Sequence, residues 1–321
     1  MRRRALLALP LVLAPAGAHA QTAAYPSRPV RLVVPFAAGG VIDVVARILA
    51  EPLSRRLGQP VVVENLPGGG TTIGGRAVAR AAADGHTLLL TGASQSVIPA
   101  LYPDAGIDPV ADFAPVALLG NQPFVVAVHP SVPAQDVAGL LAWLRAKKGE
   151  ANFATTAIGA ASHLSGELLK KLAGVELTFV TYRGTPAAVT DLVAGRADMM
   201  IDSQTLIAPL AKDGRVRALA VTTATRSRML PELPTLQEAG VPGFASSSWQ
   251  GLYAPVGTPE PVLARLAAAV AEVQAEPEVQ ARYAGSGVEP LVGGPEALQA
   301  LLKREMETWL PILRATGARA G

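Results

Sequence analysis

The residues whose types best suit ligand binding lie at a glycine corner after the first apolar run of the chain. The β-branched run 30–34 is typical of a buried strand, and apolar residues recur at helical spacing from Ile42 onward. Between them, two glycines let the backbone approach a ligand closely. The first turn of a helix leaves N–H groups unpaired and carries partial positive charge, which suits a carboxylate or phosphate. The corner residues expected to contact a ligand are Phe36, Ala37, Ala38, Gly39 and Gly40.

Asp43 falls in the first turn of this predicted helix, where the helix dipole favours a carboxylate. Two roles for it stay open at this point: it orders the corner, or it accepts a hydrogen bond from the ligand. Corners of this strand–glycine–helix kind are common in α/β proteins and most bind nothing. The stretch alone therefore also fits a purely structural role.

A serine hydrolase is the enzymatic alternative. It needs a nucleophile on a strained elbow, a base and an orienting acid. Ser94 follows a predicted strand, but the surrounding G-A-S-Q-S lacks the second glycine of the elbow. His163 would reach Ser94 only through folding, and is otherwise a residue at a helix start that contacts a loop or a ligand. We expect no catalytic residues.

Cofactor and metal sites find little support. The stretch 70–77 has the glycine spacing of a phosphate-binding loop but carries Arg76 and Ala77 where lysine and a hydroxyl are required. No G-x-G-x-x-G follows a strand. The histidines beyond residue 20 have no second histidine or carboxylate at ligand spacing, so we predict no metal and no cofactor.

The N-terminus is typical of an export signal. Residues 2–4 are arginines, 5–17 are apolar, and Ala18-His19-Ala20 is a small-residue cleavage site. The apolar part is too short to span a bilayer. We therefore expect residues 1–20 to be a signal peptide cleaved after Ala20, and the mature chain to lie in the periplasm.

Composition narrows the function further. The 321 residues hold 28 basic and 25 acidic side chains; 28 less the 3 arginines of the signal leaves 25, which balances the charge. Nucleic-acid binding loses its main support. The absence of cysteine excludes disulfides and thiolate metal sites. A chain of this length predicts two domains.

Strands and helices must position these residues, and they alternate twice along the chain. One β-α-β series covers 27–90 and another begins at the strand predicted over 124–129, with 102–123 as the connection. Such series predict mainly parallel sheets flanked by helices, with ligands beyond the carboxyl ends of the strands. The loop 91–96 lies at such an end, and Ser162 is a candidate helix cap.

Three further polar residues follow strands of the second series. Arg183, next to Tyr182, is a planar donor suited to a carboxylate, although a surface salt bridge fits equally well. Asp202 at a strand end is otherwise a turn residue.

The chain resembles the substrate-binding receptors of tripartite tricarboxylate transporters, the Bug family, over nearly its whole mature length. The shared motifs are P-F-A-A-G-G-V-I-D-V-V-A-R (35–47), V-V-V-E-N-L-P-G-G-G (61–70), A-A-D-G-H-T-L-L (82–89), S-H-L (162–164), Y-R-G (182–184), R-A-L-A-V-T (217–222), L-P-T-L-Q-E-A-G-V-P-G (233–243) and W-Q-G-L-Y-A-P-V-G-T-P (249–259). The resemblance implies a type II periplasmic binding protein of α/β class with two lobes and two hinge crossings, which holds a small carboxylate between the lobes and has no enzymatic activity.

The expected lobes follow from this resemblance. Residues 24–122 with 229–321 would form the first lobe and 123–228 the second, with crossings near 121–123 and 225–229. In the family, the corner at 36–43 holds a carboxylate through backbone donors and ordered water, and the second lobe contributes loops. The predicted ligand-binding residues are Phe36, Ala37, Ala38, Gly39, Gly40, Asp43, Thr91, Ser94, Gln95, Thr155, Thr156, Gly159, His163, Tyr182, Arg183, Gly184 and Asp202.

Three departures from the family pattern bear on the ligand. The loop before Ser162 reads A-I-G-A, without a second glycine or a hydroxyl, Leu66 replaces a frequent arginine, and Val41-Ile42 replace more polar residues. These changes predict an apolar pocket and an aromatic or nicotinate-like carboxylate rather than citrate or aspartate. We expect a monomer that docks on membrane subunits of a transporter; a ligand-presenting adaptor for a sensor protein is the alternative.

Overall fold

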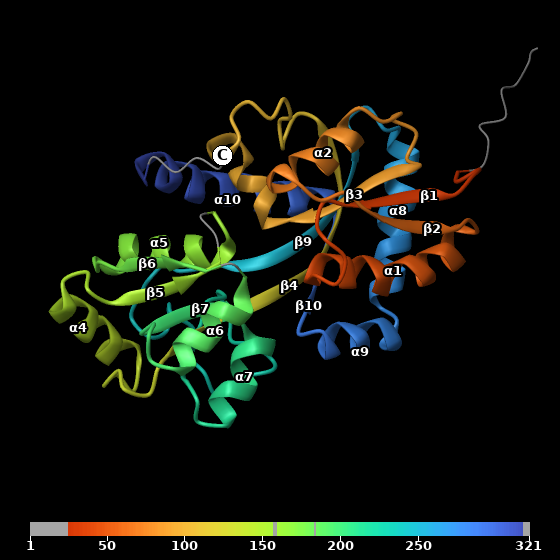
Figure 1. Ribbon diagram of the computed structural model, residues 1–321. Coiled ribbons are helices and arrows are strands. Elements are labelled where there is room, and N and C mark those ends of the chain that lie inside the picture. Colours follow the sequence, from red (N-terminus) through yellow and green to blue (C-terminus); the bar gives the residue numbers. More distant parts are fainter. Residues whose placement is uncertain (1–24, 157–158, 183, 317–321) are drawn as a thin grey trace, which may run out of the picture.

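The computed structural model describes residues 25–156, 159–182 and 184–316. Figure 1 shows two bodies, the first and second lobes, joined by the long strands β4 (Phe113–Val128) and β9 (Ser247–Pro255). The predicted signal peptide and the predicted site residue Arg183 lie outside the described residues. Within them, no helix is long and apolar enough to cross a membrane.

The first lobe is built on β-α-β units, as the alternation of apolar runs predicts. Its strands besides β9 are β1 (Val30–Val34), β2 (Val61–Asn65), β3 (Thr87–Gly92) and β10 (Glu289–Gly293). β1 pairs in parallel with β2 and β3, and β9 pairs antiparallel with β3 and β4. The order β2-β1-β3-β9-β4 places the carboxyl ends of the three parallel strands at one edge of the sheet.

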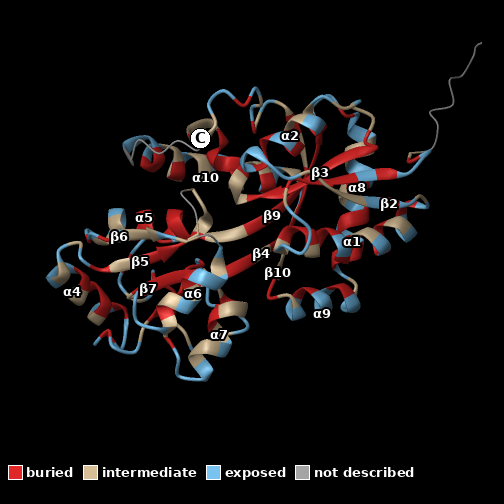
Figure 2. Ribbon diagram, in the orientation of Figure 1, coloured by how far each residue is buried: buried red, intermediate tan, exposed pale blue. Residues whose placement is uncertain are grey.

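Helices cover both faces of this sheet. The helices of the lobe are α1 (Val41–Leu57), α2 (Thr72–Ala79), α3 (Ile98–Leu101), α8 (Glu260–Gln274), α9 (Pro277–Gly285) and α10 (Pro295–Thr316), with short 3-10 turns η1 (Gly69–Thr71) and η2 (Ala93–Val97). One core cluster joins α1, α8 and α9 to one face of the sheet, and another joins α2 and α10 to the opposite face. Figure 2 shows the strands as the buried centre, with exposed residues on the outer helices.

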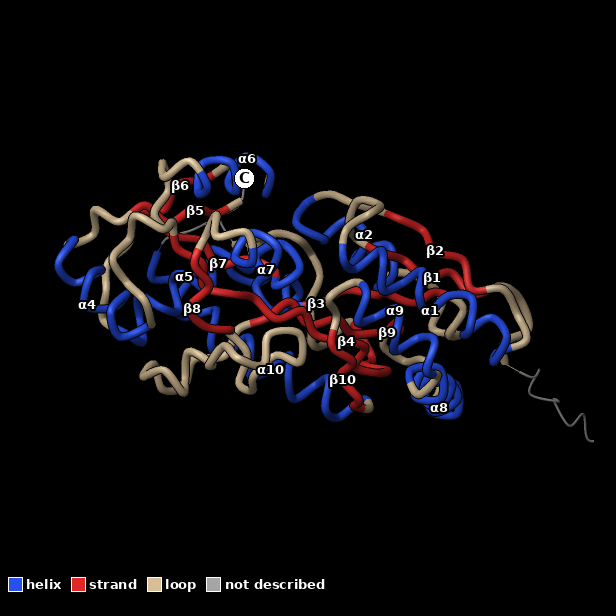
Figure 3. The backbone as a smooth tube through the Cα atoms, turned by 90° about the horizontal axis from the view of Figure 1, so that it is seen from below, coloured by secondary structure: helices blue, strands red, loops and turns tan. Residues whose placement is uncertain are grey.

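The second lobe repeats the same plan. Its strands are β5 (Asn152–Thr155), β6 (Thr178–Thr181), β7 (Met199–Ser203) and β8 (Arg217–Val221), and its helices are α4 (Val137–Lys147), α5 (Ala161–Ala173), α6 (Thr185–Val193) and α7 (Gln204–Lys212). β5 pairs in parallel with β6 and β7, while β7 and β8 pair antiparallel with β4. The parallel strands are therefore those that carry the predicted loops, and the crossing strands β4 and β9 pair antiparallel with their neighbours. The view from below shows β4 and β9 between the strands of the two lobes (Figure 3).

The first crossing is a continuous strand rather than a connection followed by a new strand. β4 pairs with β9 as far as Pro123 and with β7 from Phe124 onward. Its buried side chains belong to both cores, with Leu119 in the first lobe and Val126 in the second. The C-terminal part of the predicted connection 102–123 is therefore a strand, because the apolar side chains of β4 are buried in the core of the first lobe at one end and of the second lobe at the other.

The second crossing comes later in the chain than predicted. Leu236, Val241 and Phe244 are fully buried in the core of the second lobe, and the Leu236 N–H donates to the Val221 carbonyl at 2.9 Å. Residues 229–246, which we assigned to the first lobe, thus pack with the second lobe, and the chain returns through β9 from Ser247. The proline-rich sequence of this stretch lacks a regular periodicity, so its pattern did not indicate in which core its apolar residues are buried.

Helix α10 joins the two lobes a third time. Its residues Leu298 and Leu302 pack in the first lobe, whereas Trp309 and Ile312 pack in the cluster that contains α5 of the second lobe. Figure 1 shows the helix extending from the first lobe across the second. The lobes are therefore connected by two strands and spanned by one helix.

Candidate functional site

The carboxylate of Asp43 holds the glycine corner through hydrogen bonds. Asp43 is 2% exposed, and its Oδ2 accepts hydrogen bonds from the Gly39 N–H at 2.8 Å and from Arg47 Nε at 2.9 Å. Its Oδ1 accepts from Asn65 Nδ2 at 2.9 Å, and the same amide donates to the Phe36 carbonyl at 3.1 Å. Both carboxylate oxygens are thus engaged by donors of the corner and its neighbours, which supports the first of the two open roles: Asp43 orders the corner.

The charge of Asp43 is set by competing effects. Burial pushes its pKa upward, but the hydrogen bonds from Arg47, Gly39 and Asn65 outweigh burial and hold the pKa of the carboxyl below its ordinary value. Asp43 is therefore an anion at neutral pH. Sequence reasoning missed Asn65 as a partner, although the residue ends the strand beside β1 and its amide is suited to bridging two acceptors.

The corner itself is open. Ala37, Ala38, Gly39 and Gly40 are exposed, and a Cβ built on Gly39 would meet no heavy atom within 4 Å. Gly39 has φ +87°, a left-handed conformation that favours glycine. Gly40 is the N-cap of α1 in an extended conformation, without a side-chain cap. The first N–H groups of α1 are thus free of intrahelical partners, and the loop that precedes them is exposed.

The end of β3, which adjoins the first turn of α1, and the turn after it carry three of the predicted residues. Thr91 and Gln95 are buried, and Thr91 Oγ1, Ser94 Oγ and Gln95 Nε2 have no hydrogen-bond partner among the described residues. A Cβ on Gly92 would lie 3.5 Å from Ile42 Cδ1, so this strand end adjoins the first turn of α1. Buried polar groups are almost always hydrogen-bonded, which marks this group as one that a ligand or ordered water completes.

The second lobe contributes the loop between β5 and α5. The Thr155 and Ser162 hydroxyls hydrogen-bond at 3.0 Å, and the Gly159 N–H donates to His163 Nδ1 at 3.3 Å. Ser162, a predicted cap, is the second residue of α5, which has Ala160 as its N-cap. A Cβ on Gly159 would come within 2.3 Å of Leu101 Cδ1, so this loop packs directly on α3 of the first lobe.

His163 is buried between its own helix and β6. It is 5% exposed, its Nε2 lies 3.8 Å from Glu167 Oε1, and its ring centroid is 4.7 Å from that of Phe179. Burial, with a smaller contribution from the nearby Lys170 cation, lowers its pKa, so the imidazole is neutral at neutral pH. Nδ1 of the ring faces Gly159 and Nε2 faces Glu167. No hydrogen bond joins His163 to Ser94. The nucleophile–base pair of a hydrolase is not formed in this structure.

The remaining predicted residues lie at the carboxyl ends of the parallel strands of the second lobe. Thr156 directly follows β5, and Asp202 lies in the last two residues of β7; the two strands are adjacent in the sheet. Burial raises the pKa of Asp202, against hydrogen bonds from Ser203 that lower it. This carboxyl has no cationic partner among the described residues. Asp202 is thus a partly buried carboxyl at a strand end.

Tyr182 and Gly184 belong to the same edge but differ in their contacts. The Tyr182 N–H donates to the Thr155 carbonyl at 2.8 Å, whereas its side chain packs on the α6 side and its hydroxyl hydrogen-bonds Asp191. Gly184 is exposed and is the N-cap of α6 with φ +92°. The structure therefore places the backbone of Tyr182 beside the site loops, while its side chain is engaged elsewhere.

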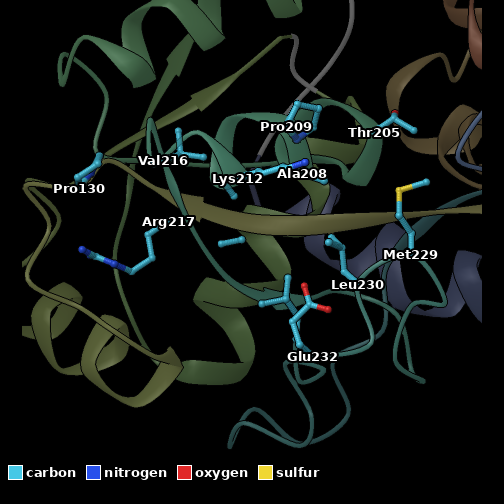
Figure 4. Close-up of a pocket in the computed structure, with 14 residues that line it drawn as sticks. Pro130, Thr205, Ala208, Pro209, Lys212, Val216, Arg217, Met229, Leu230 and Glu232 are labelled. Carbon is cyan, nitrogen blue, oxygen red and sulfur yellow. The ribbon is translucent and has the colours of Figure 1, made fainter.

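A separate apolar groove lies on the outside of the second lobe, between α7 and residues 229–233 (Figure 4). Thr205, Pro209, Met229 and Leu230 are among the side chains that line it. None of the predicted ligand-binding residues belongs to its lining. Of the described residues, no group of three or more His, Asp or Glu side chains is placed to hold a metal ion.

Known proteins of similar sequence and structure share this architecture. The family model described as tripartite tricarboxylate transporter family receptor matches residues 45–318. The structure of the periplasmic binding protein BugD is 39% identical, with a TM-score of 0.74, over 92% of this chain and 100% of that one.

Two solved structures from Rhodopseudomonas palustris contain ligands. MatC with bound malate is 36% identical, covers 90% of this chain and 100% of its own, and has a TM-score of 0.73. Rpa4515 with adipate is also 36% identical, covers 92% of this chain and 100% of its own, and has a TM-score of 0.77. The members of this family and its structural neighbours are solute-binding receptors, not enzymes. The chain belongs to the tripartite tricarboxylate transporter receptor family, which includes the Bug proteins.

Proposed function

We propose that this receptor captures a small carboxylate between its lobes and delivers it to the membrane subunits of a tripartite tricarboxylate transporter. One observation carries the proposal: the end of β3 adjoins the first turn of α1, and buried polar atoms of Thr91, Ser94 and Gln95 at this strand end and in the turn after it have no partner among the described residues. Malate and adipate, bound in the two R. palustris relatives, are both carboxylates.

The binding mode follows from the arrangement of donors. The carboxylate accepts hydrogen bonds from free N–H groups at the start of α1, where the helix dipole adds to the attraction. Thr91, Ser94 and Gln95 contact the rest of the ligand directly or through water. The loop around Gly159 completes the enclosure from the second lobe. Contacts from both lobes exist together only in the closed form, so ligand binding shifts the population toward closure.

The ligand has few polar groups beyond its carboxylate. The exposed side chains of the corner are the methyl groups of Ala37 and Ala38, and the partly buried Val41 follows them. The loop of the second lobe presents Gly159 and Ala160, which also lack polar side chains. We therefore propose an aromatic or otherwise apolar carboxylate rather than citrate or aspartate.

Calorimetric titration tests the ligand class. The purified mature chain is titrated with malate, adipate, nicotinate, benzoate, citrate and aspartate under identical conditions. We expect binding of at least one of adipate, nicotinate and benzoate, and a lower affinity for malate, citrate and aspartate. Tight citrate binding with no response to the other acids would refute the apolar ligand, and no binding of any carboxylate would refute the function itself.

Transport is tested separately with the membrane subunits of a tripartite tricarboxylate transporter. Proteoliposomes that contain these subunits should accumulate the labelled acid only when the liganded receptor is added. We expect the receptor itself to be a monomer, as measured by size-exclusion chromatography with light scattering. Uptake that is independent of the receptor would contradict delivery. Capture by a sensor protein, with no uptake, would instead support the adaptor role.

A further inference from the structure

The loops that precede α1 and α5 are built in the same way, although they belong to different lobes and share little sequence. In each, a glycine with positive φ comes first, at Gly39 (+87°) and Gly159 (+80°). An extended N-cap follows, with φ −72° and ψ 164° at Gly40 and φ −62° and ψ 154° at Ala160. The helix then begins at the next residue.

The side chain that secures each glycine comes from the same helical position. The third residue of α1 is Asp43, which accepts the Gly39 N–H at 2.8 Å; the third residue of α5 is His163, which accepts the Gly159 N–H at 3.3 Å. Both side chains are almost fully buried, at 2% and 5% exposure. In each case the acceptor lies four residues after the glycine that donates.

We propose that Asp43 and His163 are equivalent positioning residues, one in each lobe, which fix the two ligand-contacting loops by accepting the N–H of the left-handed glycine. This inference rests on the proposed function, because it assigns these residues to the loops that enclose the carboxylate. Neither side chain has to touch the ligand. Each turns one amide inward, which leaves the amides of the N-cap and the first helical turn free for the ligand.

The two acceptors differ in charge. Asp43 is an anion supported by Arg47 and Asn65, whereas His163 acts through the lone pair of a neutral imidazole. The titratable groups near His163 are Glu167 and Lys170 on its own helix, with Glu176 paired to Lys170; β6 contributes the Phe179 ring. Protonation of Nδ1 would replace the acceptor by a donor and release Gly159.

The corner of the second lobe should therefore loosen in acid while the corner of the first lobe stays ordered. The ordinary pKa of histidine is 6.5 and burial lowers that of His163, so the change falls below pH 6.5. Asp43, whose pKa is lowered from 3.8, remains charged through this range. The hydrogen bond of His163 is accordingly present at neutral pH and is lost as the pH falls through the pKa of the folded protein.

The test compares His163→Asn with His163→Leu in the full mature chain. Asparagine places Oδ1 where Nδ1 lies and keeps an acceptor that does not titrate, whereas leucine has nearly the same size and no acceptor. Amide hydrogen exchange of the segment 159–165 is measured without ligand from pH 5 to pH 7.5. Affinity for malate and adipate is measured by calorimetry over the same range.

At pH 7.5 we expect His163→Asn to bind within about threefold of wild type and His163→Leu to bind at least tenfold more weakly, with faster exchange of the segment. Wild type should lose more affinity than His163→Asn at pH 5, since protonation of the acid itself affects both proteins alike. Equal behaviour of the two variants, or a wild-type pH profile identical to that of His163→Asn, would overturn the inference.

Two outcomes separate this inference from the proposed function. If no carboxylate binds but the segment still loosens in His163→Leu, the function fails and the positioning role stands. If His163→Leu does not fold, NMR of the wild-type protein decides: the Gly159 amide signal should titrate with the same midpoint as the His163 ring. An amide signal that stays constant through that midpoint would overturn the role of His163.

Discussion

Replacement of Gly39 by valine puts a side chain directly into the proposed carboxylate position. A Cβ at Gly39 meets no heavy atom within 4 Å, so the substitution causes no clash in the protein without ligand. Its penalty for folding comes from the backbone, because φ is +87° and a left-handed residue with a side chain costs roughly 1–2 kcal/mol. The isopropyl group occupies the space through which a carboxylate must approach the N–H groups of α1. We expect affinity for malate or adipate to fall tenfold or more, about 1.4 kcal/mol.

Gly58 at the other end of α1 provides a matched control. It has φ +74°, and a Cβ there also meets nothing within 4 Å. Gly58→Val should therefore lose a similar amount of stability in urea denaturation while its affinity stays at the wild-type value. A folded Gly39→Val that binds as tightly as Gly58→Val in calorimetric titration would refute the position of the carboxylate at this corner.

Three further substitutions test other parts of the structure. Thr91→Val removes a buried hydroxyl that has no partner in the described part of the chain, so it should leave unfolding in urea unchanged or stabilise the protein by up to roughly 1–3 kcal/mol while weakening carboxylate binding; a clear loss of stability would contradict this. Asp202 has a raised pKa, so the folded state binds its proton more tightly than the unfolded state and wild type loses stability as the pH rises from the ordinary 3.8 through the raised value. Asp202→Asn should therefore raise the melting temperature at pH 7 and leave it nearly unchanged at pH 3.5, and an equal shift at both would count against burial as the cause. Phe244→Ala should destabilise the protein by about 3–5 kcal/mol and accelerate hydrogen exchange first in the second lobe, whereas exchange confined to the first lobe would contradict the packing of residues 229–246.

Local patterns predicted the elements of the candidate site well. The alternation of apolar runs predicted β1, α1 and the corner between them, because strand and helix periodicities are properties of neighbouring residues. The same reasoning placed Thr91 and Asp202 at strand ends, where parallel pairing brings loops to one edge. A local pattern cannot show which side chain, distant in the sequence, supplies a hydrogen-bond partner, as Asn65 does for Asp43.

The two errors in chain organisation have a common cause. β4 runs through the stretch predicted as a connection, and residues 229–246 fill the core of the second lobe rather than the first. In both places the burial of apolar side chains depends on strands and helices far away in the sequence. The proline-rich stretch also lacks a periodicity that would point its apolar residues toward either core.

The sequence by itself determined the α/β class, the two β-α-β series and the glycine corner, since each depends on contacts within a few residues. Only the tertiary structure decided that Asp43 orders the corner through Gly39 and Asn65, and that Gly159 of one lobe packs on Leu101 of the other. The physical reason is that hydrogen-bond partners and packing neighbours are selected by proximity in space. Proximity between the lobes is fixed by the crossings of β4 and β9, which no local pattern encodes.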